Sequence, residues 1–184
     1  MKKTIKVGLL LATLLFTAFA TRAQAQSLTA SQSRYKDRTT ENPNADADIK
    51  IVGDFLNSLV SEDLDKAKSL LAENYKGYGP APTDSTTTDQ TISSWQENYK
   101  KQLNRKVDFV TETLRVLSGI HKGDWVLVWG NYSFTQDGKN ISFPFQYIAM
   151  VADGKITADI IYYDSKYIFE TLGYKVTPPE KEMK

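Results

Sequence analysis

The sequence predicts an α+β fold, with N-terminal helices packed on one face of a curved antiparallel sheet. Two observations predict this class. Apolar residues recur at helical spacing up to about residue 103, and from residue 106 onward they alternate with a period of two. The segments that join the alternating runs are short, which is typical of antiparallel neighbours. The 184 residues are enough for one such domain with a tail at each end.

Three helices are expected before the sheet, because apolar residues recur at helical spacing in 46–63, 61–75 and 91–103. Residues 75–89, between the second and third of these, are rich in Gly, Pro, Ser and Thr, which predicts a strand end followed by a loop. The expected N-caps are Asp46 or Asp48 for the first helix and Ser61 or Asp63 for the second.

Four strands and a short final helix are expected in the second half of the chain. The final helix follows in 165–173, where Asp164 stands at the N-cap position and Gly173 is a plausible C-cap. An aspartate in that position is expected to stabilise the helix rather than to catalyse a reaction. The period-two runs that predict the strands are 106–119, 124–135, 140–152 and 155–164.

The N-terminus has the pattern of a signal peptide in residues 1–25. Three lysines precede an apolar run from Val7 to Ala20, and small residues precede a cleavage site after Ala25. Cleavage after Ala20 and a transmembrane anchor are alternatives, although the run is shorter than the ~20 residues that span a bilayer. We therefore expect an exported protein, periplasmic or secreted, without a stable membrane anchor. The remaining divisions are a flexible spacer at 26–45, one domain at 46–175 and a polar tail at 176–184.

Composition and charge exclude several classes of function. A formal net charge of +1 gives no general attraction to nucleic acid. The chain has no cysteine, so it has neither a disulfide nor a lipoprotein anchor. Its single histidine, His121, lies in an expected turn, which disfavours a zinc site and a Ser-His-Asp triad. We expect no metal and no cofactor.

Three phrases of the sequence resemble the SnoaL-like domains of the nuclear transport factor 2-like superfamily. They are LDKAKSLLAENY, GDWVLVWGNYSF and DGKITADIIYYDSKYIFETLG, and the resemblance covers about residues 47–174. It implies a cone-like roll, in which a bent sheet encloses a deep pocket that the helices close. It also implies that the protein is often dimeric through the outer face of the sheet. The superfamily includes isomerases, cyclases and epoxide hydrolases as well as proteins without catalysis, so the fold does not give the function.

The positions at which the resemblance places catalytic residues carry none here. The aspartate of SnoaL-like cyclases and limonene epoxide hydrolases corresponds to Ile161. The Arg-x-Asp pair of the epoxide hydrolases corresponds to Val128 and Gly130, and the general base of ketosteroid isomerases corresponds to Gly79. None of these side chains can accept a proton, so the resemblance favours a domain without catalysis.

Asp159 remains as a candidate catalytic residue. It lies two residues before Ile161 and therefore shares its face of the strand. Desolvation by aromatic neighbours would raise the pKa of its carboxyl and suit it to acid–base chemistry, and Tyr132, Tyr147 or Tyr163 would then donate a hydrogen bond to an oxyanion. The alternative is a structural carboxylate with a partner or in solvent. A pKa near neutrality would favour catalysis.

Aromatic residues predict a pocket for a small hydrophobic molecule. By strand parity the rings of the second half fall on the concave face, and two more come from the elements that close the mouth. The alternative is that these side chains only fill the core. The expected ligand-binding residues are Tyr78, Trp95, Tyr132, Phe143, Phe145, Tyr147, Asp159, Ile161 and Tyr163.

The opposite strand parity predicts an apolar outer face, which suggests a homodimer. We expect an exported SnoaL-like domain that binds a small apolar ligand or a partner without catalysis. One alternative is a cofactor-independent isomerase, cyclase or hydratase that uses Asp159 with a tyrosine. Another is a protein-interaction module with a filled pocket. The residues of the expected outer face are Trp125, Leu127, Trp129, Ile160 and Tyr162.

Overall fold

The structure, a computed structural model, describes residues 38–81, 83–175 and 177. The expected signal peptide, part of the spacer and most of the polar tail lie outside these residues. Contacts divide the chain into two units, Met1–Thr40 and Glu41–Lys184. Strand β1 (Thr39–Thr40) belongs to the first unit, and the other described helices and strands belong to the second.

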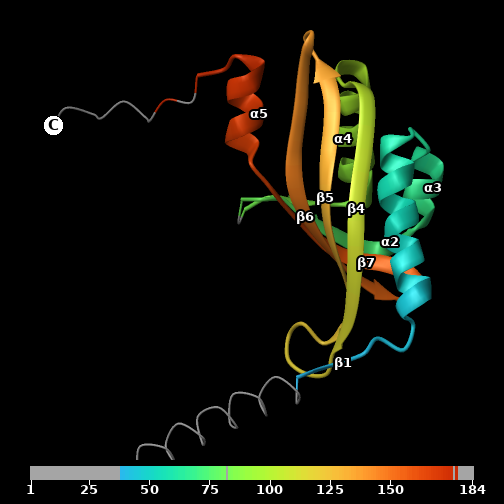
Figure 1. Cartoon of the computed structure of the whole chain (residues 1–184). Coiled ribbons are helices and arrows are strands. Elements are labelled where there is room, and N and C mark those ends of the chain that lie inside the picture. Colours follow the sequence, from blue (N-terminus) through green and yellow to red (C-terminus); the bar gives the residue numbers. More distant parts are fainter. Residues whose placement is uncertain (1–37, 82, 176, 178–184) are drawn as a thin grey trace, which may run out of the picture. The chain divides into compact units, whose positions relative to one another are not determined.

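The second unit has the expected α+β class (Figure 1). Helix α2 packs against β4, β5 and β7, and helix α4 packs against β2 and β3, so the helices cover one face of the curved sheet. Its strands follow the order β4-β5-β6-β7-β2-β3. The helices are α2 (Ala45–Val60), α3 (Leu64–Ser69), α4 (Thr88–Lys101) and α5 (Ser165–Leu172). The strands are β2 (Leu71–Tyr78), β3 (Ser85–Thr86), β4 (Leu103–Val116), β5 (Gly123–Gln136), β6 (Lys139–Ala152) and β7 (Lys155–Tyr163).

Strands β4 to β7 form an antiparallel meander, as the short connections predict. Asp137-Gly138 and Asp153-Gly154 make the last two turns with positive φ angles at both residues, the conformation that tight hairpins favour. Strand β2 then pairs with β7 in parallel, which places Gly77 beside Asp159. This parallel pairing joins an early segment of the chain to the last strand of the meander.

The prediction of a second helix over residues 61–75 is wrong for the second half of this segment. Helix α3 ends at Ser69, and the strand β2 begins at Leu71. The backbone N–H of Ile156 donates to the carbonyl of Leu70, which starts the pairing with β7. Leu71 and Tyr75 become buried in this strand. Tertiary pairing therefore overrides a helical pattern of only a few residues.

The first helix cap also differs from the expectation. Helix α2 begins at Ala45, so Asp46 and Asp48 lie inside its first turn. Asp48 is buried and accepts a hydrogen bond of 2.8 Å from the side chain of Asn42. Asn42 also donates to Thr113 on β4 at 2.9 Å. The packed structure thus reaches back at least to Asn42, which lies in the segment assigned to the spacer.

The other expected caps are confirmed. The side chain of Asp63 accepts the backbone N–H of Lys66 at the start of α3. Asp164 does the same for Tyr167 at the start of α5, at 2.9 Å. Gly173 ends α5 in the left-handed conformation, with φ of 101°, which glycine adopts at little cost.

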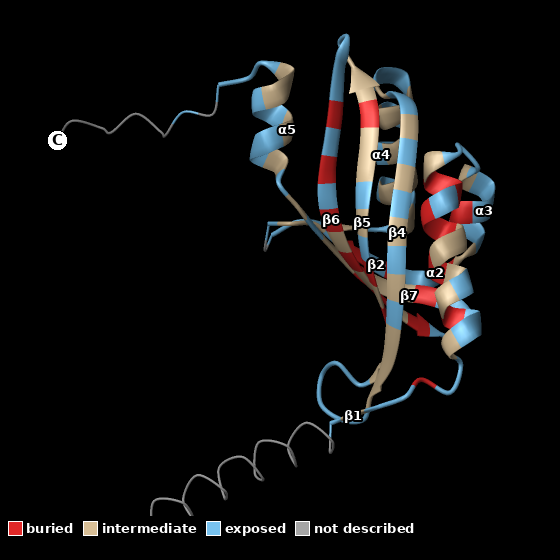
Figure 2. Ribbon diagram, viewed as in Figure 1, coloured by how far each residue is buried: buried red, intermediate tan, exposed pale blue. Residues whose placement is uncertain are grey.

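The core lies between α2 and the concave face of the sheet, where the buried residues alternate along the strands (Figure 2). Val52 and Phe55 of α2 meet Val126 and Val128 of β5 there. The opposite face carries the parity expected for the outer surface, and Trp129 and Tyr162 remain 43% and 48% exposed on it. In the part of the chain that the structure describes, no helix is long and apolar enough to cross a membrane.

Candidate functional site

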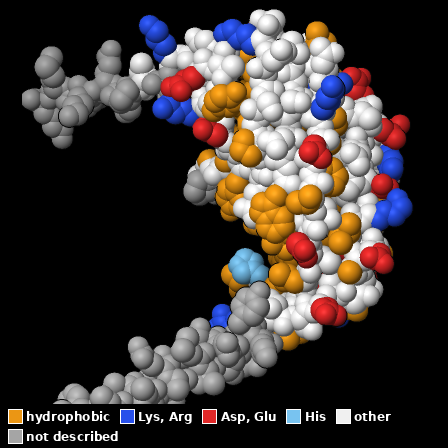
Figure 3. Space-filling view, viewed as in Figure 1, with side chains coloured by type: hydrophobic (Ala, Val, Ile, Leu, Met, Phe, Trp, Pro, Cys, Tyr) orange, Lys and Arg blue, Asp and Glu red, His pale blue; other side chains and the backbone are white. Residues whose placement is uncertain are grey.

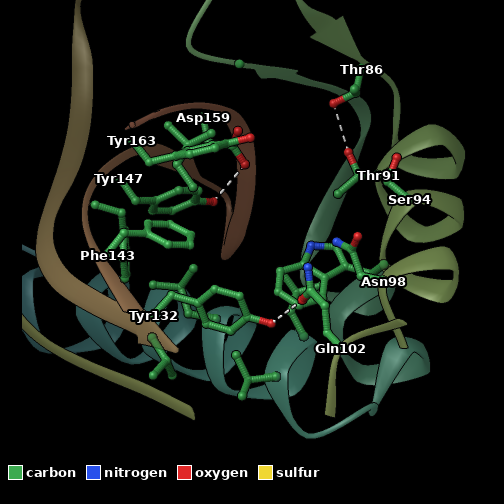
Figure 4. Close-up of a pocket in the computed structure, with 18 of the residues that line it drawn as sticks. Thr86, Thr91, Ser94, Asn98, Gln102, Tyr132, Phe143, Tyr147, Asp159 and Tyr163 are labelled. Carbon is green, nitrogen blue, oxygen red and sulfur yellow. Dashed lines mark hydrogen bonds between the residues drawn. The ribbon is translucent and has the colours of Figure 1, made fainter. Parts of the chain in front are cut away.

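A cavity of about 440 Å³ lies between α4 and the concave face of the sheet (Figure 4). Strands β5, β6 and β7 contribute aromatic side chains to it, and the other lining residues come from α2, α4, α5 and the strands β2, β3 and β4, with a few from the segments between them. Every residue that the sequence predicts for ligand binding lines this cavity. They are Tyr78, Trp95, Tyr132, Phe143, Phe145, Tyr147, Asp159, Ile161 and Tyr163.

Two tyrosine hydroxyls converge on one oxygen of Asp159. The hydroxyl of Tyr75 donates to Oδ2 at 2.6 Å, and the hydroxyl of Tyr147 donates to the same atom at 2.7 Å (Figure 4 draws the second bond). Asp159 is 5% exposed and Tyr147 is 3% exposed, so water reaches this group only through the cavity. The carboxylate is therefore both buried and partnered.

The environment of Asp159 shifts its ionisation. Burial raises the pKa of its carboxyl to about 6, while the hydrogen bonds from Tyr75, Tyr147 and the backbone of Tyr78 lower it. Burial, together with the nearby carboxylate, holds the pKa of both the Tyr75 and Tyr147 hydroxyls well above the usual value. At neutral pH the group is thus a carboxylate held by two neutral phenols.

Gly77 makes room for this arrangement. A Cβ atom on Gly77 would lie 2.5 Å from the Tyr75 hydroxyl and 3.1 Å from Asp159 Oδ1. It would also lie 2.7 Å from the hydroxyl of Thr86, which hydrogen-bonds to Thr91 across 2.9 Å. Strand β2 can therefore pack against Asp159 only because residue 77 has no side chain.

The opposite side of the cavity is polar but neutral. Helix α4 begins with a capping box, in which the side chains of Thr87 and Gln90 each accept a backbone N–H of the other residue and so fix the start of the helix. Figure 4 shows the polar side chains of α4 along one side of the cavity. The hydroxyl of Tyr132 donates to Oε1 of Gln102 at 2.7 Å across it. The polar lining residues of α4 and its C-cap are Thr91, Ser94, Asn98 and Gln102.

Sequence reasoning missed two parts of this site. Tyr75 was hidden in the segment that predicts a helix, although the sequence ENYKGY around it could have suggested a strand. The polar side of α4 does not follow from the apolar residues at helical spacing, because these indicate only the side of the helix that packs on the core. Thr91, Ser94 and Asn98 recur at helical spacing, and that pattern could have identified the helix side.

None of the four positions to which the resemblance assigns catalytic residues carries an ionisable side chain. Val128 is fully buried in the core, and Ile161 lines the cavity with an aliphatic side chain. A Cβ on Gly130 would lie 2.5 Å from the carbonyl oxygen of Asp108, so no side chain fits there. At Gly79 the space is taken by Asp84, whose Cβ would be 2.8 Å away.

His121 lies apart from the cavity lining, in the turn between β4 and β5. Its carbonyl accepts a hydrogen bond of 2.7 Å from the indole of Trp125. Among the described residues, no group of three or more His, Cys, Asp or Glu side chains is placed to hold a metal ion.

Several solved structures share this fold. An LEH-like epoxide hydrolase from M. tuberculosis is 21% identical, with a TM-score of 0.55 and coverage of 71% of this chain and 92% of the other. A hypothetical protein with a ketosteroid isomerase-like fold from Catenulispora acidiphila, in complex with trimethylamine, is 17% identical, with a TM-score of 0.56 and coverage of 70% and 98%. A putative polyketide cyclase from Bacillus cereus is 20% identical, with a TM-score of 0.54 and coverage of 67% and 78%.

At these identities the likeness concerns the fold and not the activity. A comparison with curated proteins finds no match. The model of the SnoaL-like domain matches residues 52–158, which is more than half of the chain and spans α3, α4 and the strands β2 to β6. The chain therefore belongs to the SnoaL-like domain family, within the nuclear transport factor 2-like superfamily.

Proposed function

We propose that the domain binds a small, mostly apolar molecule in the cavity and does not catalyse a reaction on it. The observation that carries this proposal is an unfilled space of about 440 Å³ lined mainly by aromatic and aliphatic side chains. This volume lies within the range of about 300–1,000 Å³ typical of small-molecule sites. A core whose aromatic side chains merely packed together would leave no space of this size.

The hydrogen bonds of Tyr132 and Tyr147, two of the three candidate donors, argue against their use in stabilising an oxyanion. Tyr147 donates its proton to Asp159 and Tyr132 donates its proton to Gln102. A phenol has one proton, so neither hydroxyl can stabilise a developing negative charge without first losing its present partner. The corresponding catalytic positions of related enzymes carry no base. Binding accounts for the cavity without requiring any of these groups to change partners.

A second candidate is acid–base catalysis by Asp159, as in a cofactor-independent isomerase, cyclase or hydratase. The observation in its favour is that burial raises the pKa of Asp159 to about 6, which brings the group close to the pH at which acid–base catalysts operate. Solved structures that share this fold include one described as an epoxide hydrolase and one described as a putative polyketide cyclase, and both descriptions name classes of enzyme.

Native mass spectrometry of the protein purified from its natural host tests the first proposal. We expect a discrete additional mass that leaves on denaturation, which would also give the class of the bound molecule. An unliganded mass, together with no change in tryptophan fluorescence over a set of apolar compounds, would contradict binding, because Trp95, one of the three tryptophans, lines the cavity.

The same ligand separates the two candidates. Incubation of the ligand with the wild-type protein and with Asp159→Asn, followed by analysis of the recovered compound, shows whether turnover occurs. Under the first proposal both proteins return the compound unchanged. Conversion by the wild-type protein that Asp159→Asn abolishes would establish catalysis, with Phe143→Leu as a control that changes the same cavity without removing the carboxylate or a hydroxyl.

We also propose that the protein is exported. The lysines and apolar run of residues 1–25 support a cleaved signal peptide, as does the small-residue pattern that ends at Ala25. N-terminal sequencing of the protein from the host envelope is expected to begin at Gln26. A chain that retains residues 1–25 would contradict cleavage.

A further inference from the structure

The charge of the cavity lining is unusual for a site surrounded by rings. Among the described residues that line the cavity, Asp159 is the only one with a charged side chain, and none is Lys, Arg or His. The other polar groups are neutral hydroxyls and amides. Arg105, near the C-terminal end of α4, pairs with Glu62 and lies over the ring of Tyr99 at 4.6 Å. The partners of Asp159 are therefore hydroxyl and N–H groups and not a cation.

The direction of the hydrogen bonds makes this end of the cavity rich in acceptors. Tyr75 and Tyr147 each donate their proton to Asp159, so each phenolic oxygen keeps lone pairs for another donor. A ligand at this end meets one carboxylate and two phenolic oxygens. A carboxylate or phosphate of a ligand would be repelled, whereas N–H groups would find partners.

The rings beside Asp159 favour positive charge as well. Figure 4 shows Tyr147, Tyr163 and Phe143 on the same side of the cavity as the carboxylate. The rings of Phe143 and Tyr163 lie 5.5 Å apart and tilted by 35°, so they form a continuous aromatic surface. The faces of such rings carry negative potential and attract a cation within about 6 Å.

We propose that the cavity binds a small organic cation, a protonated amine whose N–H groups bond to Asp159 and the two phenolic oxygens. Its hydrocarbon part packs on Phe143 and Tyr163, and its far end reaches the neutral polar residues of α4. This inference rests on the proposed binding function and adds the charge of the ligand. The buried carboxylate then has the role of a counter-ion, which explains its partnering by hydroxyls without any catalytic step.

Three probes of the same shape but different charge test this inference. They are 2-phenylethylammonium, the neutral 2-phenylethanol and the anionic 3-phenylpropionate, titrated at neutral pH with tryptophan fluorescence and calorimetry as readouts. We expect the ammonium to bind at least about tenfold more tightly than the alcohol, and the carboxylate to bind most weakly. High salt should weaken binding of the ammonium only slightly, because the ion pair between the ammonium and Asp159 is buried.

Asp159→Asn should remove the preference for the ammonium and leave binding of the alcohol nearly unchanged. Asp153→Asn is the matched control, because it makes the same change of charge at an exposed acid in the turn between β6 and β7, outside the lining. If Asp159→Asn fails to fold, the ranking of the three probes on the wild-type protein decides the question alone.

The outcomes distinguish this inference from the proposed function. Equal binding of the ammonium and the alcohol, or a preference for the carboxylate, would overturn the inference that the ligand is a cation. The proposal that the cavity binds a small apolar molecule would remain. An ammonium preference that persists in Asp159→Asn would overturn the role of the carboxylate. No binding of any probe would overturn the inference. Native mass spectrometry of the protein from its host would then test the proposed function separately.

Discussion

At the scale of single residues, Asp159 couples the stability of the fold to pH. Its carboxyl has a pKa of about 6 in the folded protein, against an ordinary value of 3.8. The folded state therefore holds this proton more tightly than the unfolded state does. The contribution to the free energy of unfolding is fully present below pH 3.8 and is lost as pH rises to about 6, a change of about 3 kcal/mol.

Urea denaturation of the wild-type protein and of Asp159→Asn tests this coupling. The difference in stability between the two should shift by this amount between pH 4 and pH 7. Paired acids such as Asp54 and Asp124, whose pKa values are lowered by their partners, act in the opposite direction but equally in both proteins. A difference that does not depend on pH would contradict a raised pKa.

Two glycines give a matched pair of substitutions with opposite signs. Gly77→Ala should lower the free energy of unfolding by about 1–3 kcal/mol, because the new Cβ displaces the hydroxyls around Asp159. Gly53→Ala, in the interior of α2, should raise it by about 0.5–1 kcal/mol, because a Cβ there meets Phe109 at an ordinary 3.8 Å. Thermal denaturation of both variants checks this; equal effects would contradict a close approach at Gly77.

At the scale of elements, α5 depends on its cap as well as on the packing of Ile168 and Leu172 against Phe134, Ile141 and Phe143. The helix has only eight residues and none of them is buried. Asp164→Ala should therefore lower stability by about 1 kcal/mol, whereas Asp164→Asn should cost much less. Ile168 and Phe169 of this helix line the cavity, so fraying should also weaken ligand binding. Denaturation and probe titration of both variants measure the two effects; an equal loss in both variants would argue against capping.

The elements also show what could be predicted from the sequence. The strands β4 to β7 and the caps at Asp63 and Asp164 followed from local patterns, and so did the cavity face of the meander. Strand β2 could not be predicted in the same way, because its pairing with β7 is parallel and joins residues far apart in the sequence. Tyr75 was missed with it. The register that brings Gly77 beside Asp159 is a tertiary property that no local pattern contains.

At the scale of the molecule, the outer face of the sheet predicts a homodimer. Val110, Trp129, Gln146 and Tyr162 follow one another across four strands, and three of these side chains are apolar and exposed. Figure 3 shows hydrophobic side chains gathered over the strands, above the single histidine. Exposed apolar side chains that lie next to one another, unlike ones scattered singly, are typical of an interaction surface.

Sedimentation at micromolar concentration is expected to show a dimer. Trp129→Glu should shift it to monomer, because a charge would be buried without a partner in the interface. Ile120→Glu is the control, since Ile120 is 96% exposed but lies in the turn between β4 and β5. A wild-type protein that is monomeric under these conditions would contradict the predicted homodimer.

The parallel pairing of β2 with β7 has a consequence for how the protein folds. The bond from Tyr75 to Asp159 joins residues 84 positions apart, so the chain must close a long loop before the carboxylate gains this partner. Such non-local contacts form slowly and after the local hairpins. The meander can therefore assemble while the cavity is still open along β7. Retention of a ligand would then report that the last long-range contact has formed, which makes binding a measure of complete folding.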